Sequence, residues 1–156
     1  MAKTLVVYYS HIGNTQAIAK QIQTATDGDI FEIKPVKPYP SEYHETTEQA
    51  QQEINAGFKP EIKSRVENIE AYDTIFIGSP CWWSTIAPPV TTFLSTHNLS
   101  GKTIIPFMTH EGSKLGHSTS SIAQLVPNAT IKAGHAFYGS SAKSAKENVE
   151  KWLKDM

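Results

Sequence analysis

The sequence contains little reactive or strongly charged chemistry. Cysteine and arginine occur once each, as Cys81 and Arg65, and the net charge at pH 7 is only −1. A single cysteine excludes an intramolecular disulfide framework and is typical of a reducing compartment. The near-neutral charge provides neither a basic stripe for nucleic acid nor a strongly acidic face for a cationic partner. We therefore expect no nucleic-acid partner.

Long apolar runs and targeting signals are also missing. No apolar stretch approaches the length that crosses a bilayer, and residues 1–30 show no signal-peptide pattern. The histidines at positions 11, 44, 97, 110, 117 and 135 have no zinc-type spacing with cysteine or acidic residues. The sequence thus predicts a cytoplasmic protein without membrane insertion and without a metal site.

Strand-like and helix-like segments alternate along the chain. Strands are predicted at residues 5–9, 30–33, 74–78, 103–108 and 130–137, and residues 59–72 are expected to be irregular. Helices are predicted between the strands and after the last one. Their buried stripes include Ile18, Ile22 and Ala25 in the first helix and Ala142, Ala145, Val149, Trp152 and Leu153 in the last.

This alternation predicts an α/β fold: a doubly wound, five-stranded parallel sheet with helices on both faces, formed by residues 1–156 as a single domain. In the strand order 2-1-3-4-5, the carboxyl ends of strands 1, 3 and 4 lie side by side, and a ligand is expected there.

The turn at residues 10–15 has the composition of a phosphate-binding loop. Ser10, Asn14 and Thr15 supply hydroxyl and amide groups, and Gly13 permits a tight turn that points backbone N–H groups inward at a helix start. The nucleotide-loop lysine, the G-x-G-x-x-G spacing and the cysteine–arginine pair of a phosphatase loop are all absent. A phosphate here would be held by neutral groups, which favours a retained monophosphate. A simple helix cap is the alternative.

A tandem tryptophan follows the third strand. Trp82 and Trp83 cannot both enter one core, so at least one is expected to face the crevice, where a flat aromatic ligand would stack on it. Packing of both beneath the loop is the alternative. Cys81 has no identifiable base partner, so nucleophilic chemistry is not expected, and no catalytic residue is assigned.

A polar loop is predicted from Thr109 to Ser118. Its glycines permit close backbone approach, and its hydroxyls and amides can bond the polar edge of a ring system. His110 could donate a proton to a reduced, anionic ring, because histidine titrates near neutrality; a solvated histidine is the alternative.

These three loops resemble those of the flavodoxin family, and the resemblance extends from Lys3 to Leu153. The motifs are Tyr-Ser-x-x-Gly-Asn-Thr at residues 9–15, Gly-Ser-Pro-Cys-Trp-Trp at residues 78–83 and Thr-His-Glu-Gly-Ser at residues 109–113. The resemblance is closest to short bacterial flavodoxin-like proteins with a tandem-tryptophan second loop, and it implies a flavodoxin-like fold. It also implies non-covalent FMN, bound by Ser10, Ile12, Gly13, Asn14, Thr15, Ser79, Pro80, Cys81, Trp82, Trp83, Thr109, His110, Glu111, Gly112 and Ser113.

The function implied is electron transfer through bound FMN, with redox partner proteins. The alternative is an FMN-dependent NAD(P)H or quinone oxidoreductase with a small quinone-like acceptor. An open outer flavin face favours this alternative, because the third loop lacks an aromatic residue. A third interpretation is a binding domain without redox turnover.

Glu111 stands where relatives often have glycine, and its carboxylate would disfavour an anionic reduced flavin.

Overall fold

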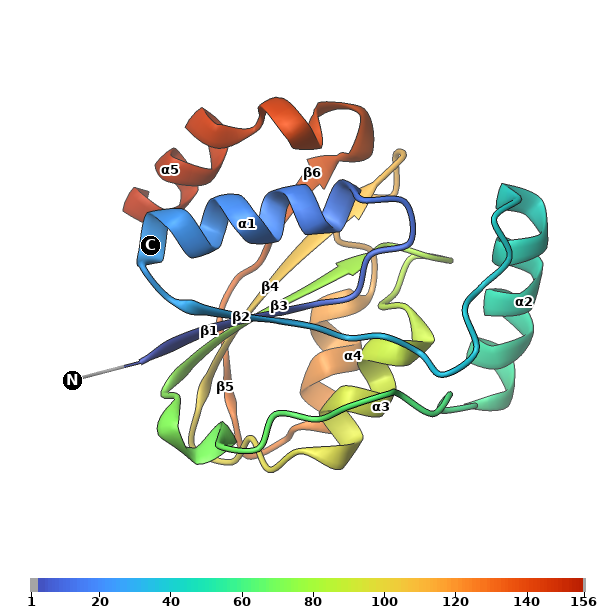
Figure 1. Ribbon diagram of the computed structural model, residues 1–156, viewed down its shortest axis with the longest axis horizontal. Helices are drawn as coiled ribbons and strands as arrows, with labels where there is room; N and C mark the ends of the chain where they lie inside the picture. The colour runs from blue at the N-terminus through green and yellow to red at the C-terminus, as the bar shows by residue number, and fades with distance from the viewer. Residues whose placement is uncertain (1–2, 156) are drawn as a thin grey trace.

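The computed structural model describes residues 3–155, which form a parallel sheet flanked by helices (Figure 1). The strands are β1 (Thr4–Tyr8), β2 (Asp29–Glu32), β3 (Thr74–Pro80), β4 (Thr103–His110), β5 (Thr130–Ile131) and β6 (His135–Tyr138). They are ordered β2-β1-β3-β4-β5, and β6 also pairs with β4. The predicted order 2-1-3-4-5 is confirmed.

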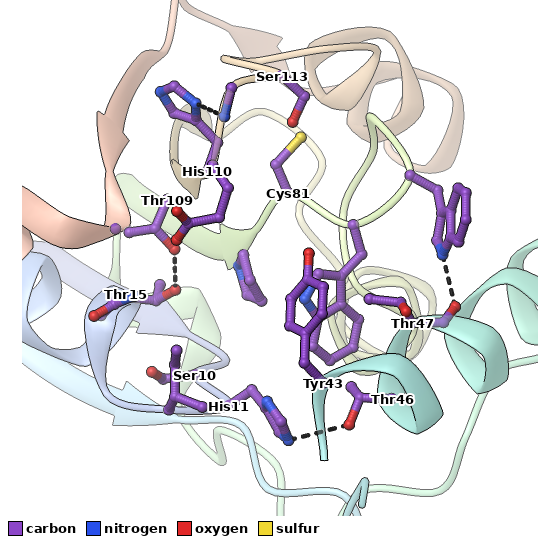
Figure 2. A pocket seen from close by; sticks show the side chains of 18 of the residues that line it. Ser10, His11, Thr15, Tyr43, Thr46, Thr47, Cys81, Thr109, His110 and Ser113 are labelled. Atoms are coloured by element: carbon purple, nitrogen blue, oxygen red, sulfur yellow. Dashed lines mark hydrogen bonds between the residues drawn. The ribbon is translucent and has the colours of Figure 1, made fainter. Parts of the chain in front are cut away.

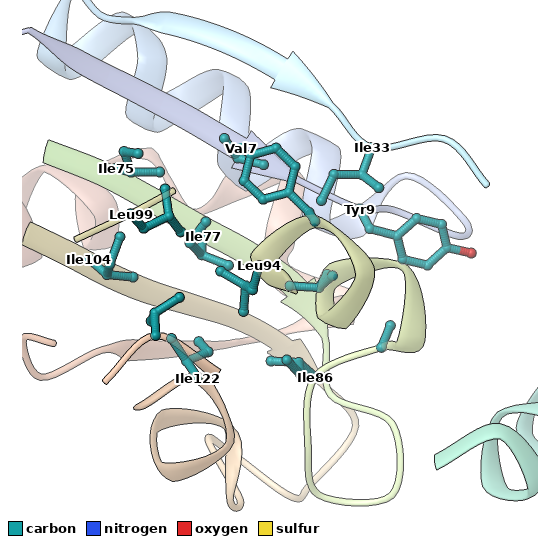
Figure 3. Close-up of a cluster of buried hydrophobic side chains, with 14 of the residues drawn as sticks. Val7, Tyr9, Ile33, Ile75, Ile77, Ile86, Leu94, Leu99, Ile104 and Ile122 are labelled. Carbon is teal, nitrogen blue, oxygen red and sulfur yellow. The ribbon is translucent and has the colours of Figure 1, made fainter. Parts of the chain in front are cut away.

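Helices cover both faces of the sheet, as predicted. α1 (Asn14–Thr26) and α5 (Lys146–Asp155) lie on one face, and α3 (Pro88–Thr96) and α4 (Ser118–Leu125) lie on the other (Figure 1). Successive strand residues point to opposite faces, so Val6 joins one buried cluster and Val7 the other. Figure 3 shows the cluster of Val7. Among the described residues, no helix is both long and apolar enough to cross a membrane.

The predicted fifth strand, residues 130–137, is divided into β5 and β6. The interruption lies opposite Ile105 and Pro106 of β4, where Pro106 has no N–H to donate to the ladder. Residues 132–134 face these two positions, so the edge strand carries one residue more than its partner, as in a bulge. A side chain at Gly134 would place Cβ 2.6 Å from the Pro106 carbonyl oxygen.

Two helix predictions also need correction. The last predicted helix is a 3-10 helix, η2 (Gly139–Ser144), followed by α5, although its predicted stripe is buried or partly buried. Serine favours local turns over continuous helix, and the Ser144 hydroxyl donates to the carbonyl of Ser141. Ala25 is exposed, because it lies in the last turn of α1. Residues 59–72 are largely irregular, with one short 3-10 helix, η1 (Ile69–Ala71).

Helix α2 (Tyr43–Ala56) stands apart from both helical layers, beyond the carboxyl ends of the strands (Figure 1). Only Thr46 and Ala50 of this helix are buried. Most of its residues are exposed or only partly buried. The structure adds its position, beside the crevice where a ligand is expected.

Replacement of Gly78 by alanine is expected to destabilise the fold by about 1 to 3 kcal/mol, because the new Cβ would clash with the buried ring of Phe107 on the neighbouring strand. Urea unfolding measures the loss. In a Phe107→Leu background the same replacement should cost clearly less. Equal losses in the two backgrounds would contradict the clash.

Candidate functional site

A cavity of about 460 Å³ lies at the carboxyl ends of β1, β3 and β4 (Figure 2). This volume is within the range of small-molecule sites. The three predicted loops and the N-terminal half of α2 form its walls. All the predicted site residues line it except Gly13 and Ser79.

One end of the cavity is the start of α1. Gly13 has φ of 98°, in the left-handed region that favours glycine, and its N–H donates to Ser10 Oγ at 3.0 Å. No side chain in the described part of the chain caps this helix, so the helix-cap alternative is wrong. Within residues 3–155, the backbone N–H groups of Asn14, Thr15 and Gln16 have no hydrogen-bond partner. They leave this end suited to an anion.

The first loop is joined to β4 by two hydroxyls. Thr15 Oγ1 and Thr109 Oγ1 lie 2.8 Å apart, and both side chains are buried (Figure 2). β4 continues to His110, so Thr109 and His110 are strand residues and the predicted polar loop begins later. The side chain of Thr15 therefore fixes the relative position of two cavity walls.

His110 is buried, so the alternative of a solvated histidine is wrong. Its Nδ1 accepts from the N–H of Gly112 at 2.9 Å, and its ring contacts that of Tyr138, with centroids 4.4 Å apart. Burial lowers the pKa of His110; the charge of Glu111 opposes this shift, and that of Lys114 reinforces it. The imidazole is therefore mainly neutral at pH 7.

The two tryptophans have different environments. Trp82 is 7% exposed and packs edge-on against Tyr9 and Tyr39, with centroid distances of 5.7 and 5.1 Å. Trp83 is 50% exposed, and its indole N–H donates to the carbonyl of Thr47 in α2 at 2.7 Å. Both line the cavity, so the alternative in which both pack beneath the loop is wrong.

Two predicted site residues support the loops without lining the cavity. Ser79 is fully buried, and its hydroxyl accepts from Ala87 N–H and donates to Pro80 O. Gly13 supplies the turn described above.

Cys81 lines the cavity and is partly buried; burial raises the pKa of its thiol, although a hydrogen bond with Ser113 opposes this shift. A protonated thiol agrees with the expectation that Cys81 is no nucleophile.

Sequence reasoning missed the wall formed by α2. Tyr43, His44, Thr46 and Thr47 line the cavity, as do His11, Ser84 and Gly139. A side chain at Gly139 would place Cβ 2.5 Å from Glu111 Oε1 and 2.6 Å from Asn14 Nδ2, so these two side chains would have to shift to accommodate it. The only signal for α2 was an aromatic residue at the start of a polar helix, which sequence periodicity does not connect to a distant loop.

Charge is scarce in the cavity. Among the described residues that line it, none is lysine or arginine, and Glu111 is the one acidic residue. Within the same part of the chain, no group of three histidine, cysteine or acidic residues could hold a metal. A bound phosphate would be held by hydroxyls and N–H groups, as predicted.

The fold and the position of the cavity define a doubly wound α/β protein with a ligand site at its topological switch point. The sequence model of the flavodoxin family, described as Flavodoxin, matches residues 3–156. The chain belongs to this family, and the predicted family is confirmed. Among curated protein sequences, none matches the chain.

Solved structures agree with this assignment. A protein from Bacteroides eggerthii DSM 20697 assigned as a flavoprotein has 33% identity and a TM-score of 0.85, covering 99% of this chain and 98% of its own. A similarly assigned protein from Bacteroides uniformis ATCC 8492 has 32% identity and a TM-score of 0.86, with 98% of each chain covered. A flavoprotein in complex with FMN from Lactobacillus acidophilus NCFM has 25% identity and a TM-score of 0.80, covering 98% of this chain and 99% of its own.

Replacement of Thr15 by valine is expected to lower the free energy of unfolding by about 1 to 3 kcal/mol, because it leaves the buried Thr109 hydroxyl without its partner. Urea unfolding of the ligand-free protein measures this. Thr15→Ser retains the hydroxyl and is the matched control. Equal stability of the two variants would show that the hydroxyl pair contributes nothing.

Cys81 is expected to react slowly with thiol reagents in the folded protein. Because the pKa of its thiol is raised, the thiolate fraction at pH 8 is smaller than in the unfolded chain. The reaction rate of the folded protein should therefore be about tenfold lower than that of the unfolded protein. The rate should rise steeply above pH 9. A disulfide reagent followed by absorbance measures both, with the urea-unfolded protein as the control. A folded-state rate that is already maximal at pH 8 would contradict the raised pKa.

Proposed function

We propose that this protein binds FMN non-covalently and transfers electrons through it. The observation that carries the proposal is the cavity itself: free backbone N–H groups lie at one end, and aromatic side chains lie along its walls. Membership of the flavodoxin family supports it, as does the similar protein from Lactobacillus acidophilus NCFM that is in complex with FMN.

The phosphate would bind at the start of α1. Ser10 and the N–H groups of Asn14, Thr15 and Gln16 supply neutral donors, and the helix dipole favours a negative charge there. No cation is required, which agrees with the lack of lysine and arginine among the described lining residues.

The ring would lie between the second and third loops, against Trp82 or Trp83 and beside Thr109 to Ser113. FMN supplies the redox chemistry when bound, and the protein positions it and tunes its potential. The carboxylate of Glu111 would lower that potential, because it disfavours added negative charge on the ring. Because the His110 imidazole is mainly neutral, it places no positive charge beside the ring.

Redox partner proteins are the acceptors that the flavodoxin family implies. A second candidate is an FMN-dependent NAD(P)H or quinone oxidoreductase with a small acceptor. It is favoured by the net charge of −1, which gives little electrostatic steering toward a charged protein partner. The proposal also includes a single domain and a cytoplasmic location, which a lone free cysteine supports.

An FMN titration of the purified protein, followed by an anaerobic redox titration, tests the proposal. FMN is expected to bind at one equivalent, and riboflavin, which lacks the phosphate, at least about tenfold more weakly. Reduction in two separable one-electron steps would support electron shuttling. A single two-electron step, with steady-state turnover of NAD(P)H and a quinone, would support the oxidoreductase instead.

Failure to bind FMN would overturn both candidates and leave a binding domain for another ligand. Equal affinity for FMN and riboflavin would retain the flavin and reject the phosphate site at α1.

A further inference from the structure

Helix α2 contributes little to the core of the protein. Thr46 and Ala50 are its only buried residues, and it lies off the sheet (Figure 1). A helix with so small a buried face gains little stability from packing. Its position must be held by other contacts.

Polar contacts with the cavity loops hold its N-terminal half. His11 Nε2 lies 2.8 Å from the carbonyl oxygen of Pro40, so this nitrogen carries a proton and donates it; the Thr46 hydroxyl donates to the same oxygen at 2.5 Å. The Trp83 indole N–H donates to the Thr47 carbonyl, as described above. His11 belongs to the first loop and Trp83 to the second. The loops that form the cavity therefore also place α2 beside it.

Tyr43, the first residue of α2, is the side chain that this placement presents to the cavity. Its ring lines the cavity and is 58% exposed. Figure 2 shows the ring across the cavity from Thr15 and Thr109. Among residues 3–155, its one aromatic neighbour is His44, with centroids 6.0 Å apart. The ring therefore has a large apolar surface that the protein itself leaves uncovered.

The second loop offers one further exposed aromatic ring, that of Trp83, which lines the cavity and is 50% exposed. Trp82 already packs edge-on against three rings, those of Tyr9, Tyr39 and His11. The third loop, residues 111–117 between β4 and α4, contains no phenylalanine, tyrosine or tryptophan. An aromatic ligand in this cavity would therefore find free aromatic surface on α2, in addition to that of Trp83.

We propose that Tyr43 covers the isoalloxazine ring of the bound FMN, so that α2 supplies the aromatic surface that the third loop lacks. This inference rests on the proposed function. It replaces the expectation of an open outer flavin face with a face that a helix covers. It also makes α2 part of the cofactor site rather than a peripheral helix.

Chemical protection tests the proposal on the wild-type protein. Tetranitromethane nitrates exposed tyrosines, and Tyr43 and Tyr138 are similarly exposed, at 58% and 52%. Tyr138 lies against His110 and is not among the residues that line the cavity, so it is the internal control. Saturating FMN should slow nitration of Tyr43 at least about fivefold and leave Tyr138 unchanged, as measured by peptide mass spectrometry. Equal nitration of Tyr43 with and without FMN would overturn the proposal.

Substitution provides the second test. Tyr43→Ala should raise the Kd for FMN about tenfold, and Tyr43→Phe less than about twofold, because the ring and not the hydroxyl makes the contact. Phe58→Ala is the matched control: Phe58 follows α2, is 53% exposed and does not line the cavity. Its Kd should equal that of the wild type. Circular dichroism verifies that each variant is folded.

The outcomes separate this inference from the proposed function. If the wild type binds no FMN, both fail. If it binds FMN but Tyr43 is not protected and Tyr43→Ala binds as tightly as wild type, the proposed function stands and the role of Tyr43 is rejected. If Tyr43→Phe loses as much affinity as Tyr43→Ala, the contact is a hydrogen bond from the hydroxyl, and the covering role is also rejected.

Discussion

Parallel pairing of β3 with both β1 and β4 is the constraint on which the site depends. Because the three strands run in one direction, their following loops meet at a single edge of the sheet. Backbone bonds extend this pairing into the loops: Tyr9 N–H donates to Gly78 O at 3.0 Å, and Cys81 N–H donates to Thr109 O at 2.7 Å. The cavity is thus a continuation of the sheet rather than a gap between flexible segments.

The chemistry of the cavity depends on groups that carry no net charge. Free N–H groups at the start of α1 form one end, and a neutral His110 and a protonated Cys81 lie farther along the walls. In the low dielectric of a partly enclosed cavity, fixed dipoles stabilise an anion without the desolvation penalty of a buried cation. Such a site is suited to holding a phosphate rather than transferring it.

Helix α2 forms a wall of the site although it contributes little to the core. Its polar contacts with the Pro40 carbonyl and with Trp83 join the connection before the helix, the helix itself and two loops. Each of these hydrogen bonds contributes little free energy, but each gives a polar group a partner within the protein. The geometry of this wall is therefore coupled to that of the loops.

Most cavity residues were implied by the resemblance to the flavodoxin family. The strands and the first loop followed from local patterns: an apolar run predicts a buried strand, and glycine and hydroxyl residues at its end predict an anion loop. The break opposite Pro106, the burial of His110 and the different environments of Trp82 and Trp83 did not, because each depends on a neighbouring strand or on α2. Sequence by itself determined which loops meet, since parallel pairing leaves few arrangements. Only the tertiary structure decided that Tyr43 faces them, because its placement depends on hydrogen bonds between residues tens of positions apart, which no local periodicity encodes.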